Sequence, residues 1–284
     1  MTQWFVHDYL YRVLNVKLSF EAKSPFRIGA GKSTSLTSPV DLQVLRININ
    51  GREVQYIPGS SLKGVFRSVS EFIAKSNGIN ACMAGNECKD NYNRKLDDAL
   101  RSRNLDEVRK ILASYCLICK LYGSGSYASH IIFGDMFPEG DIAIGVKTGI
   151  AIDRRSGTAK RGALYTVEFI MPGSIFKGNI TLINTPNYAI GLLSYVIKLI
   201  NDGVIRIGGF KSRGFGQFSV NPMEINGEII HNNKVMKISE VDIFEPLDEF
   251  DSEVNIADVG RNYAKLLERF RIAWDNYVSK IKHS

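Results

Sequence analysis

Strand-like and helix-like segments follow one another along this chain in an order that few folds can accommodate. Residues 11–23 partly alternate between apolar and polar side chains, which predicts a strand. Asn50-Gly51 lies between two similar runs, and this dipeptide favours the tight turn of a β-hairpin. A helix is expected next, beginning near Ser60 or Ser61 and ending at Asn77-Gly78. Its predicted apolar face consists of Val65, Phe66, Val69, Phe72 and Ile73.

The second half of the chain continues this order. Two strands are expected on either side of Pro172-Gly173, then a helix from Asn187, a loop, and a strand that begins near Gln217. The order of strand, helix, strands, helix and strand predicts an α+β protein with a ferredoxin-like βαββαβ core. The last 25 residues predict a further amphipathic helix.

All four cysteines lie in one polar segment, residues 79–120, which we interpret as a helical insertion. The four are Cys82, Cys88, Cys116 and Cys119, and the second pair has the C-x-x-C spacing. Four thiolates that can meet around one ion are typical of a structural Zn²⁺ site. Two disulfides or four buried thiols are the alternatives. A closed site of four cysteines has no open position, so the ion would stabilise the insertion without catalysing a reaction.

Charge is unevenly distributed along the 284 residues, whose formal net charge is +7. Four cations, Arg154, Arg155, Lys160 and Arg161, gather within eight residues, whereas residues 239–260 are acidic. Clustered basic loops favour a polyanionic partner, although a solvated basic surface would give the same pattern. There is no apolar run long enough to cross a bilayer and no signal-peptide pattern, so we expect no membrane partner and a cytoplasmic location.

The stretch GGFKSRGFG, residues 208–216, contains four glycines around Lys211 and Arg213. It matches neither a Walker loop nor a dinucleotide fingerprint. Glycines would allow backbone N–H groups to approach a phosphate, which the two cations would neutralise. The alternative is an ordinary turn between a helix and a strand.

A second candidate phosphate site is the helix start PGSSLKGVFR. Ser60, Ser61 and the first helical N–H groups could hold an anion, and Lys63 and Arg67 would share one helix face. An ordinary capped helix start would explain the serines. It would not explain Gly64, which weakens a helix unless something approaches the backbone closely.

These segments together resemble the RAMP superfamily, and in particular the backbone subunits of type III CRISPR effector complexes (the Csm/Cmr kind). The resemblance rests on RIGAGKS…PVD, YIPGSSLKGVFR, CxxCKLYGS, IDRRSGTAKRGALYTVEFIMPGSIF and IGGFKSRGFGQFSV, in this order over residues 14 to about 220. It implies a modified RNA-recognition-type fold whose copies stack along a CRISPR guide RNA, together with other subunits and the target RNA. It also implies a β-hairpin thumb within about residues 130–165.

Together these interpretations divide the chain into three parts. Residues 1–78 and 121–235 would form the RNA-binding core, residues 79–120 the zinc-stapled insertion, and residues 236–284 an acidic linker with the C-terminal helix. The residues expected to contact RNA are Lys32, Ser60, Ser61, Lys63, Arg67, Arg154, Arg155, Lys160, Arg161, Lys211 and Arg213.

The resemblance also implies a catalytic residue. In active families, a loop aspartate before the PGSSLKG turn cuts the target RNA, and Asp41 is the position that matches best. Asp41 would take the proton of a ribose 2′-hydroxyl or hold a Mg²⁺ or similar ion against the phosphate, with Lys32 stabilising the charged transition state. Some family members instead carry the aspartate directly before SPV, where this chain has Thr37.

Three functions therefore remain open from the sequence. The chain could be a guide-binding subunit that also cuts the target by metal-dependent transesterification, or a scaffold that binds RNA without cutting it. It could also be a stand-alone endoribonuclease that processes guide RNA. That last role usually uses a histidine near the first turn, and residues 28–40 contain none. His130 is interpreted as structural.

Overall fold

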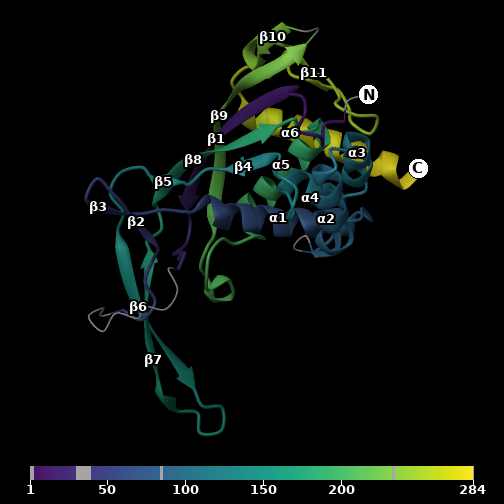
Figure 1. Ribbon diagram of the computed structural model, residues 1–284. Coiled ribbons are helices and arrows are strands. Elements are labelled where there is room, and N and C mark those ends of the chain that lie inside the picture. The colour runs from purple at the N-terminus through teal and green to yellow at the C-terminus, as the bar shows by residue number, and fades with distance from the viewer. Residues whose placement is uncertain (1–2, 30–39, 84–85, 232–233, 284) are drawn as a thin grey trace.

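The computed structural model describes residues 3–29, 40–83, 86–231 and 234–283 of the chain (Figure 1). They form helices and antiparallel sheets, which confirms the predicted α+β class. Within these ranges, no helix combines the length and the apolar composition that crossing a bilayer requires.

The main sheet is antiparallel, and its strands run in the order β10-β9-β1-β8-β4, with β5 also paired to β8. Its strands are β1 (Arg12–Ala22), β4 (Ile131–Phe133), β5 (Phe137–Pro138), β8 (Ile175–Ile183), β9 (Phe218–His231) and β10 (Lys234–Lys237). Strand β1 is central, with Val16 opposite Ile180 on one side and Ile225 on the other. The two strands predicted around Pro172-Gly173 are confirmed as β7 and β8.

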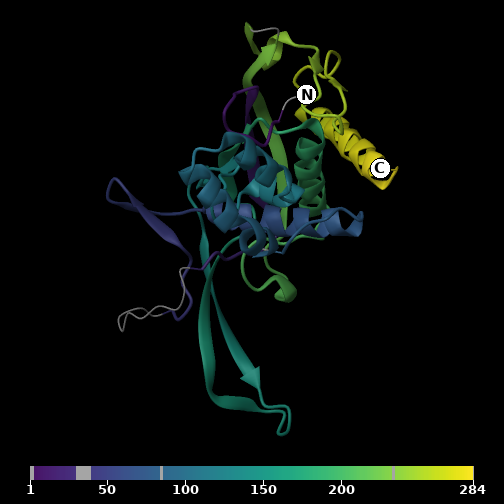
Figure 2. The same ribbon diagram turned by 45° about the vertical axis from the view of Figure 1, so that its right-hand side comes forward.

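Three smaller two-stranded sheets branch from this body. They are β2 (Arg46–Ile49) with β3 (Arg52–Gln55), β6 (Ile144–Ile152) with β7 (Ala159–Ile170), and β11 (Ile243–Phe244) with β12 (Val254–Asn255). The β2–β3 turn is Asn50-Gly51, as predicted, and both residues have positive φ. The β6–β7 hairpin projects far from the body in both views (Figures 1 and 2).

The helices gather on one side of the main sheet. They are α1 (Gly59–Ser76), α2 (Asn86–Arg101), α3 (Leu105–Ala113), α4 (Leu117–Tyr122), α5 (Asn187–Asn201) and α6 (Tyr263–His283), with short 3₁₀ turns η1 (Lys211–Arg213) and η2 (Ile238–Glu240). Helices α1 and α5 contact the sheet and each other, α6 packs on α5, and α2 to α4 form the insertion beside α1 (Figure 2).

Alternation along the strands separates a core face from an open face. In β1, the side chains of Leu14, Leu18 and Phe20 are fully buried beneath the helices, whereas Asn15 and Lys17 are exposed. A fully buried leucine or phenylalanine side chain contributes about 1.5–3 kcal/mol to folding. The apolar face predicted for α1 is correct for Phe66 and Val69 but wrong for Phe72, which is 66% exposed.

The acidic segment before α6 was expected to be a linker, yet part of it belongs to the core. The buried carboxylate of Asp251 accepts hydrogen bonds from the backbone N–H groups of Asn187 (3.0 Å) and Tyr188 (3.1 Å), which start α5. Buried Arg12 donates to the carbonyl oxygen of Thr185, and burial lowers its pKa to about 10 against the opposing charge of Asp251. This segment therefore closes the end of the molecule away from the β6–β7 hairpin (Figure 1).

Candidate nucleic-acid interface

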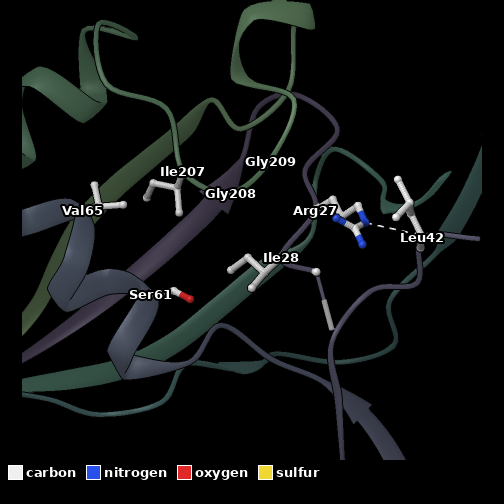
Figure 3. A pocket seen from close by; sticks show the side chains of 9 residues that line it. Arg27, Ile28, Leu42, Ser61, Val65, Ile207, Gly208 and Gly209 are labelled. Atoms are coloured by element: carbon white, nitrogen blue, oxygen red, sulfur yellow. Dashed lines mark hydrogen bonds between the residues drawn. The ribbon is translucent and has the colours of Figure 1, made fainter. Parts of the chain in front are cut away.

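The two candidate phosphate segments meet in one cavity of about 540 Å³. Ser61 and Val65 of α1 form one wall, and Gly208 and Gly209 of the glycine-rich loop form another. The third wall consists of Arg27, Ile28, Gly29 and Leu42. Figure 3 shows the Ser61 hydroxyl and the Arg27 guanidinium on opposite sides of this space. We call it the groove.

The glycine-rich loop is held rigidly against the body, and this anchoring explains some of its glycines. Gly208 has a φ of +91°, and a Cβ atom there would overlap the carbonyl oxygen of Arg27. The N–H of Gly209 donates to that same oxygen (2.8 Å), and the N–H of Gly216 donates to the carbonyl oxygen of Pro25 (2.8 Å). Two of the predicted phosphate donors are therefore used inside the protein, while Lys211 stays exposed at the tip.

The α1 start differs from its sequence-based prediction. Neither Ser60 nor Ser61 caps the helix: the N-cap residue is Pro58, which makes no side-chain cap bond. The first helical N–H, that of Gly59, donates instead to the carboxylate of Asp135 (2.7 Å). One N–H of the predicted anion site is thus already occupied by a carboxylate of the same chain.

Gly64 remains without an internal explanation. Ser61, Gly64 and Val65 share a helix face because residues three and four apart are neighbours on a helix. Gly64 is exposed, and a Cβ atom built on it would meet no atom of the described residues within 4 Å. A glycine here costs the helix about 1 kcal/mol relative to alanine. The bare backbone therefore lies open next to the groove wall.

Arg27 is a groove residue that was missed from the sequence. Its side chain crosses Gly29, where a Cβ atom would overlap the guanidinium, and it donates to the carbonyl oxygens of Leu42 (3.3 Å) and Gln43 (3.0 Å). Burial lowers its pKa, opposed by the charge of Glu168. A signal was present: in an extended chain, positions 27 and 29 point to the same side, so the glycine leaves room for the arginine.

The other side of the glycine-rich loop packs on the base of the β6–β7 hairpin. Phe215 is buried and contacts Phe169 edge to face, with ring centroids 5.5 Å apart. Arg213 donates to the Tyr165 hydroxyl (2.7 Å) and lies over the Phe210 ring. The loop therefore connects the groove with the hairpin.

The hairpin presents cations at its far end and apolar side chains along one face. Arg154, Arg155 and Lys160 are exposed and form no ion pair with any residue in the described ranges. Facing residues Ile150 and Leu164 are 54% and 68% exposed. Nothing is described for the Arg161 side chain, and Lys32 lies outside the described residues.

Asp41 is attached to the hairpin base. Its Oδ2 accepts hydrogen bonds from the backbone N–H (2.7 Å) and the hydroxyl (3.0 Å) of Thr166. These bonds, led by the one from the backbone, lower the pKa of the exposed Asp41 carboxyl below its ordinary value of 3.8. A carboxylate with a lowered pKa is a weaker proton acceptor at neutral pH. Its fixed negative charge still suits a cation.

Arg67 was predicted to contact RNA, but its guanidinium is bonded within the protein and is not directed toward solvent. Its Nε pairs with Glu71 (3.0 Å), its Nη1 donates to the carbonyl oxygen of Gly123 (2.9 Å) and its Nη2 to the sulfur of Cys119 (3.4 Å). Lys63 lies one turn earlier on the same face, and burial, then the charge of Arg67, lowers its pKa. This face of α1 is directed toward the insertion rather than the groove.

The insertion brings the four cysteines together. All four are buried, and their sulfur atoms lie within 4.8 Å of one another. Cys116 starts α4, and its sulfur accepts the N–H of Cys119 (3.4 Å), which is the geometry that the C-x-x-C spacing permits. The possible metal site predicted from spacing is thus present as a cluster of ligands.

His130 is structural, as interpreted from the sequence. It is fully buried, its Nδ1 donates to the carbonyl oxygen of Ile183 (2.9 Å), and its Nε2 lies 2.7 Å from the Tyr127 hydroxyl. Burial lowers its pKa to about 4. A buried imidazole with both nitrogens occupied cannot serve an RNA-processing reaction at the surface.

Comparison with known proteins identifies one family. No curated protein matches the chain significantly. A model of the RAMP superfamily, however, matches residues 19–219, a range that runs from the end of β1 to the start of β9 and includes the groove, the hairpin and the cysteine cluster. Membership of this family indicates a CRISPR-associated, RNA-binding function. Because the match covers well over half of the sequence, the chain belongs to the RAMP superfamily.

Proposed function

We propose that this chain is a guide-RNA-binding backbone subunit of a type III CRISPR effector complex. The observation that carries the proposal is the groove, in which segments about 150 residues apart in sequence, the α1 start and the glycine-rich loop, line one cavity with Arg27. Bare backbone, a hydroxyl and a guanidinium are groups that hold phosphates without reading bases. RAMP membership supports RNA as the ligand.

In this proposal the RNA backbone runs past α1 and the glycine-rich loop. Gly64 lets the ribose-phosphate chain approach the helix closely, and the Ser61 hydroxyl donates to a phosphate. Lys211 neutralises charge at the rim. The two central strands of the open sheet face carry Asn15, Lys17, Asn179 and Thr181, so they offer no aromatic platform for stacked bases.

The hairpin would act as the thumb. Its apolar face, with Ile150 and Leu164, suits contact with splayed bases, and its terminal cations Arg154, Arg155 and Lys160 suit a phosphate strand or an adjacent copy. The strand order β9-β1-β8-β4 with α1 and α5 supports a ferredoxin-like core. We further propose that copies of the chain assemble on the guide with other subunits in the cytoplasm.

We propose Zn²⁺ for the cysteine cluster. Tetrahedral Zn–S bonds of about 2.3 Å place sulfur atoms about 3.8 Å apart. The separation of Cys82 from Cys116 (3.6 Å) is near this value, whereas that of Cys82 from Cys119 (3.1 Å) is shorter, so these two sulfur atoms would move apart when the ion binds. Bound zinc would supply folding stability to the insertion and no chemistry.

Cleavage of the target RNA is a separate part of the proposal. The 2′-hydroxyl of a target ribose loses its proton to solvent and its oxygen attacks the adjacent phosphorus. The bond to the 5′-oxygen breaks and this oxygen takes up a proton from solvent, leaving a 2′,3′-cyclic phosphate and a 5′-hydroxyl. The charge of Asp41 would hold a Mg²⁺ or similar ion, which would neutralise the reacting phosphate. The lowered pKa of Asp41 favours this role over proton transfer.

Two experiments test these proposals. The tagged chain is isolated from the cells that make it, and the RNA that accompanies it is sequenced; short RNAs from CRISPR arrays are expected, and their absence would contradict guide binding. In the assembled complex, Asp41→Asn should abolish target cleavage and keep guide binding. Asp153→Asn is the matched control, because Asp153 is also a hydrogen-bonded aspartate of the hairpin and is partly exposed. If the complex still cleaves the target with Asp41→Asn, Asp41 is not the catalytic residue, and the chain would serve as a scaffold that binds RNA.

A further inference from the structure

Arg67 links the groove helix to the cysteine cluster. The side chain is 17% exposed, and its guanidinium spans Glu71 of α1, the backbone after α4 and the sulfur of Cys119. Every nitrogen of the fork has a partner. A cation held this way between two elements is placed to fix their relative position.

The charge of the cluster explains why a guanidinium lies there. Four thiolates around one divalent ion carry a net charge of −2, and a buried net charge is costly unless a cation or a hydrogen-bond donor compensates it. Cys119 is fully buried, and its sulfur is the atom that Arg67 contacts. Donors to ligand atoms typically change metal affinity by about 10- to 100-fold.

The same stretch of chain holds α1 at more than one point. The Tyr122 hydroxyl, at the end of α4, bonds to Ser70 of α1 (2.9 Å), and Asp135, after β4, accepts the first N–H of the helix. The residues between them leave the cysteine cluster and enter the main sheet as β4. Movement of α4 would therefore be transmitted to the α1 turn that lines the groove.

We infer that Arg67 is an outer-shell partner of a metal centre at the four cysteines, and that through it the metal positions α1 for RNA binding. Arg67 is a positioning residue and does not touch RNA. The RNA part of this inference rests on the proposed function, whereas the metal part stands on the cluster alone.

The test measures metal retention and RNA affinity separately. The full chain is loaded with Zn²⁺, and the rate of zinc transfer to a colorimetric chelator is followed for Arg67→Met, Arg67→Lys and the wild type. Arg67→Met should release zinc about 10- to 100-fold faster. Arg67→Lys, which keeps the charge but loses the fork, should lie between. Binding of a fluorescent single-stranded RNA should weaken in the same order, and removal of zinc from the wild type should weaken it too.

Arg109→Met is the matched control. Arg109 lies on α3 of the same insertion in a surface ion pair with Asp8, so neither zinc release nor RNA binding should change. Wild-type zinc release by Arg67→Met would overturn the inference. So would weaker RNA binding at unchanged zinc release, since it would mean that Arg67 contacts RNA directly. A wild-type chain that retains zinc but binds no RNA would contradict the proposed function and leave the metal part standing.

Discussion

Helices α1 and α5 occupy equivalent places beneath the sheet, but their N-termini are used differently. Both begin after a proline and neither has a side-chain cap from its N-cap residue. Asp251 closes the start of α5 with two hydrogen bonds, in a buried setting. The start of α1 has one N–H bonded to Asp135 and otherwise borders the groove. A buried carboxylate thus closes the start of α5 with two bonds, whereas at α1 a carboxylate takes only the first N–H and the following residues border the groove.

The two helices also differ in how they use a glycine. A Cβ atom at Gly191 of α5 would overlap the carbonyl oxygen of Phe270, because α6 packs directly on it. A Cβ atom at Gly64 of α1 would meet nothing among the described residues. Gly191 is therefore explained by packing within the chain, whereas no packing among the described residues explains Gly64.

The largest difference is expected from removing the two carboxylates. Asp251→Ala leaves the buried N–H groups of Asn187 and Tyr188 without their acceptor. Because each buried donor left unsatisfied costs about 1–3 kcal/mol, the free energy of unfolding should fall by about 2–6 kcal/mol. Asp135→Ala removes one partly buried bond and should cost about 1 kcal/mol. Urea unfolding measures both. Equal losses of unfolding free energy would contradict the view that Asp251 stabilises the start of α5 more than Asp135 stabilises the start of α1.

Alanine at the two glycines should act in opposite directions. Gly191→Ala forces α5 and α6 apart and should cost about 1–3 kcal/mol. Gly64→Ala should stabilise the protein by up to about 1 kcal/mol. It should also weaken binding of single-stranded RNA severalfold, because the added methyl group occupies the open backbone. If Gly64→Ala binds RNA as tightly as the wild type, close approach of RNA at this position is wrong.

The smallest effect is expected from single cations. Lys211→Ala should reduce the slope of log affinity against log salt by about 0.7 for the lost phosphate contact. Lys198→Ala is the control on α5, since Lys198 already pairs with Asp202 (2.5 Å). Fluorescence anisotropy over a series of salt concentrations measures both slopes. A slope unchanged by Lys211→Ala would show that this lysine contacts no phosphate.

The sequence predicts those parts of the fold that depend on neighbouring residues. Alternation in β1, the Asn50-Gly51 turn and the existence of helices α1 and α5 depend on local sequence, and the structure confirms them. The buried role of Asp251 could not be foreseen, because the N–H groups that bond to it, those of Asn187 and Tyr188, lie more than 60 residues earlier in the chain. An acidic segment is usually solvated, and only tertiary packing makes this residue part of the core.

In the groove, too, the sequence predicts the local segments but not the contacts between residues far apart in the chain. The two glycine-containing segments were identified, and the structure brings them together. The sequence did not show where the long arginine side chains point. Arg67 points to Cys119, more than 50 residues away in sequence, and the Arg27 side chain lies across Gly29 in the groove wall. Helical spacing gives the face on which a side chain lies, but not which element covers that face.

Hydrogen exchange with and without single-stranded RNA tests the central claim most directly. The claim is that the α1 start and the glycine-rich loop hold one RNA strand between them. RNA should slow exchange in residues 59–65 and in residues 206–214 together, and leave the start of α5 at residues 187–191 unchanged. Protection of only one of the first two segments, or of neither, would contradict a shared groove.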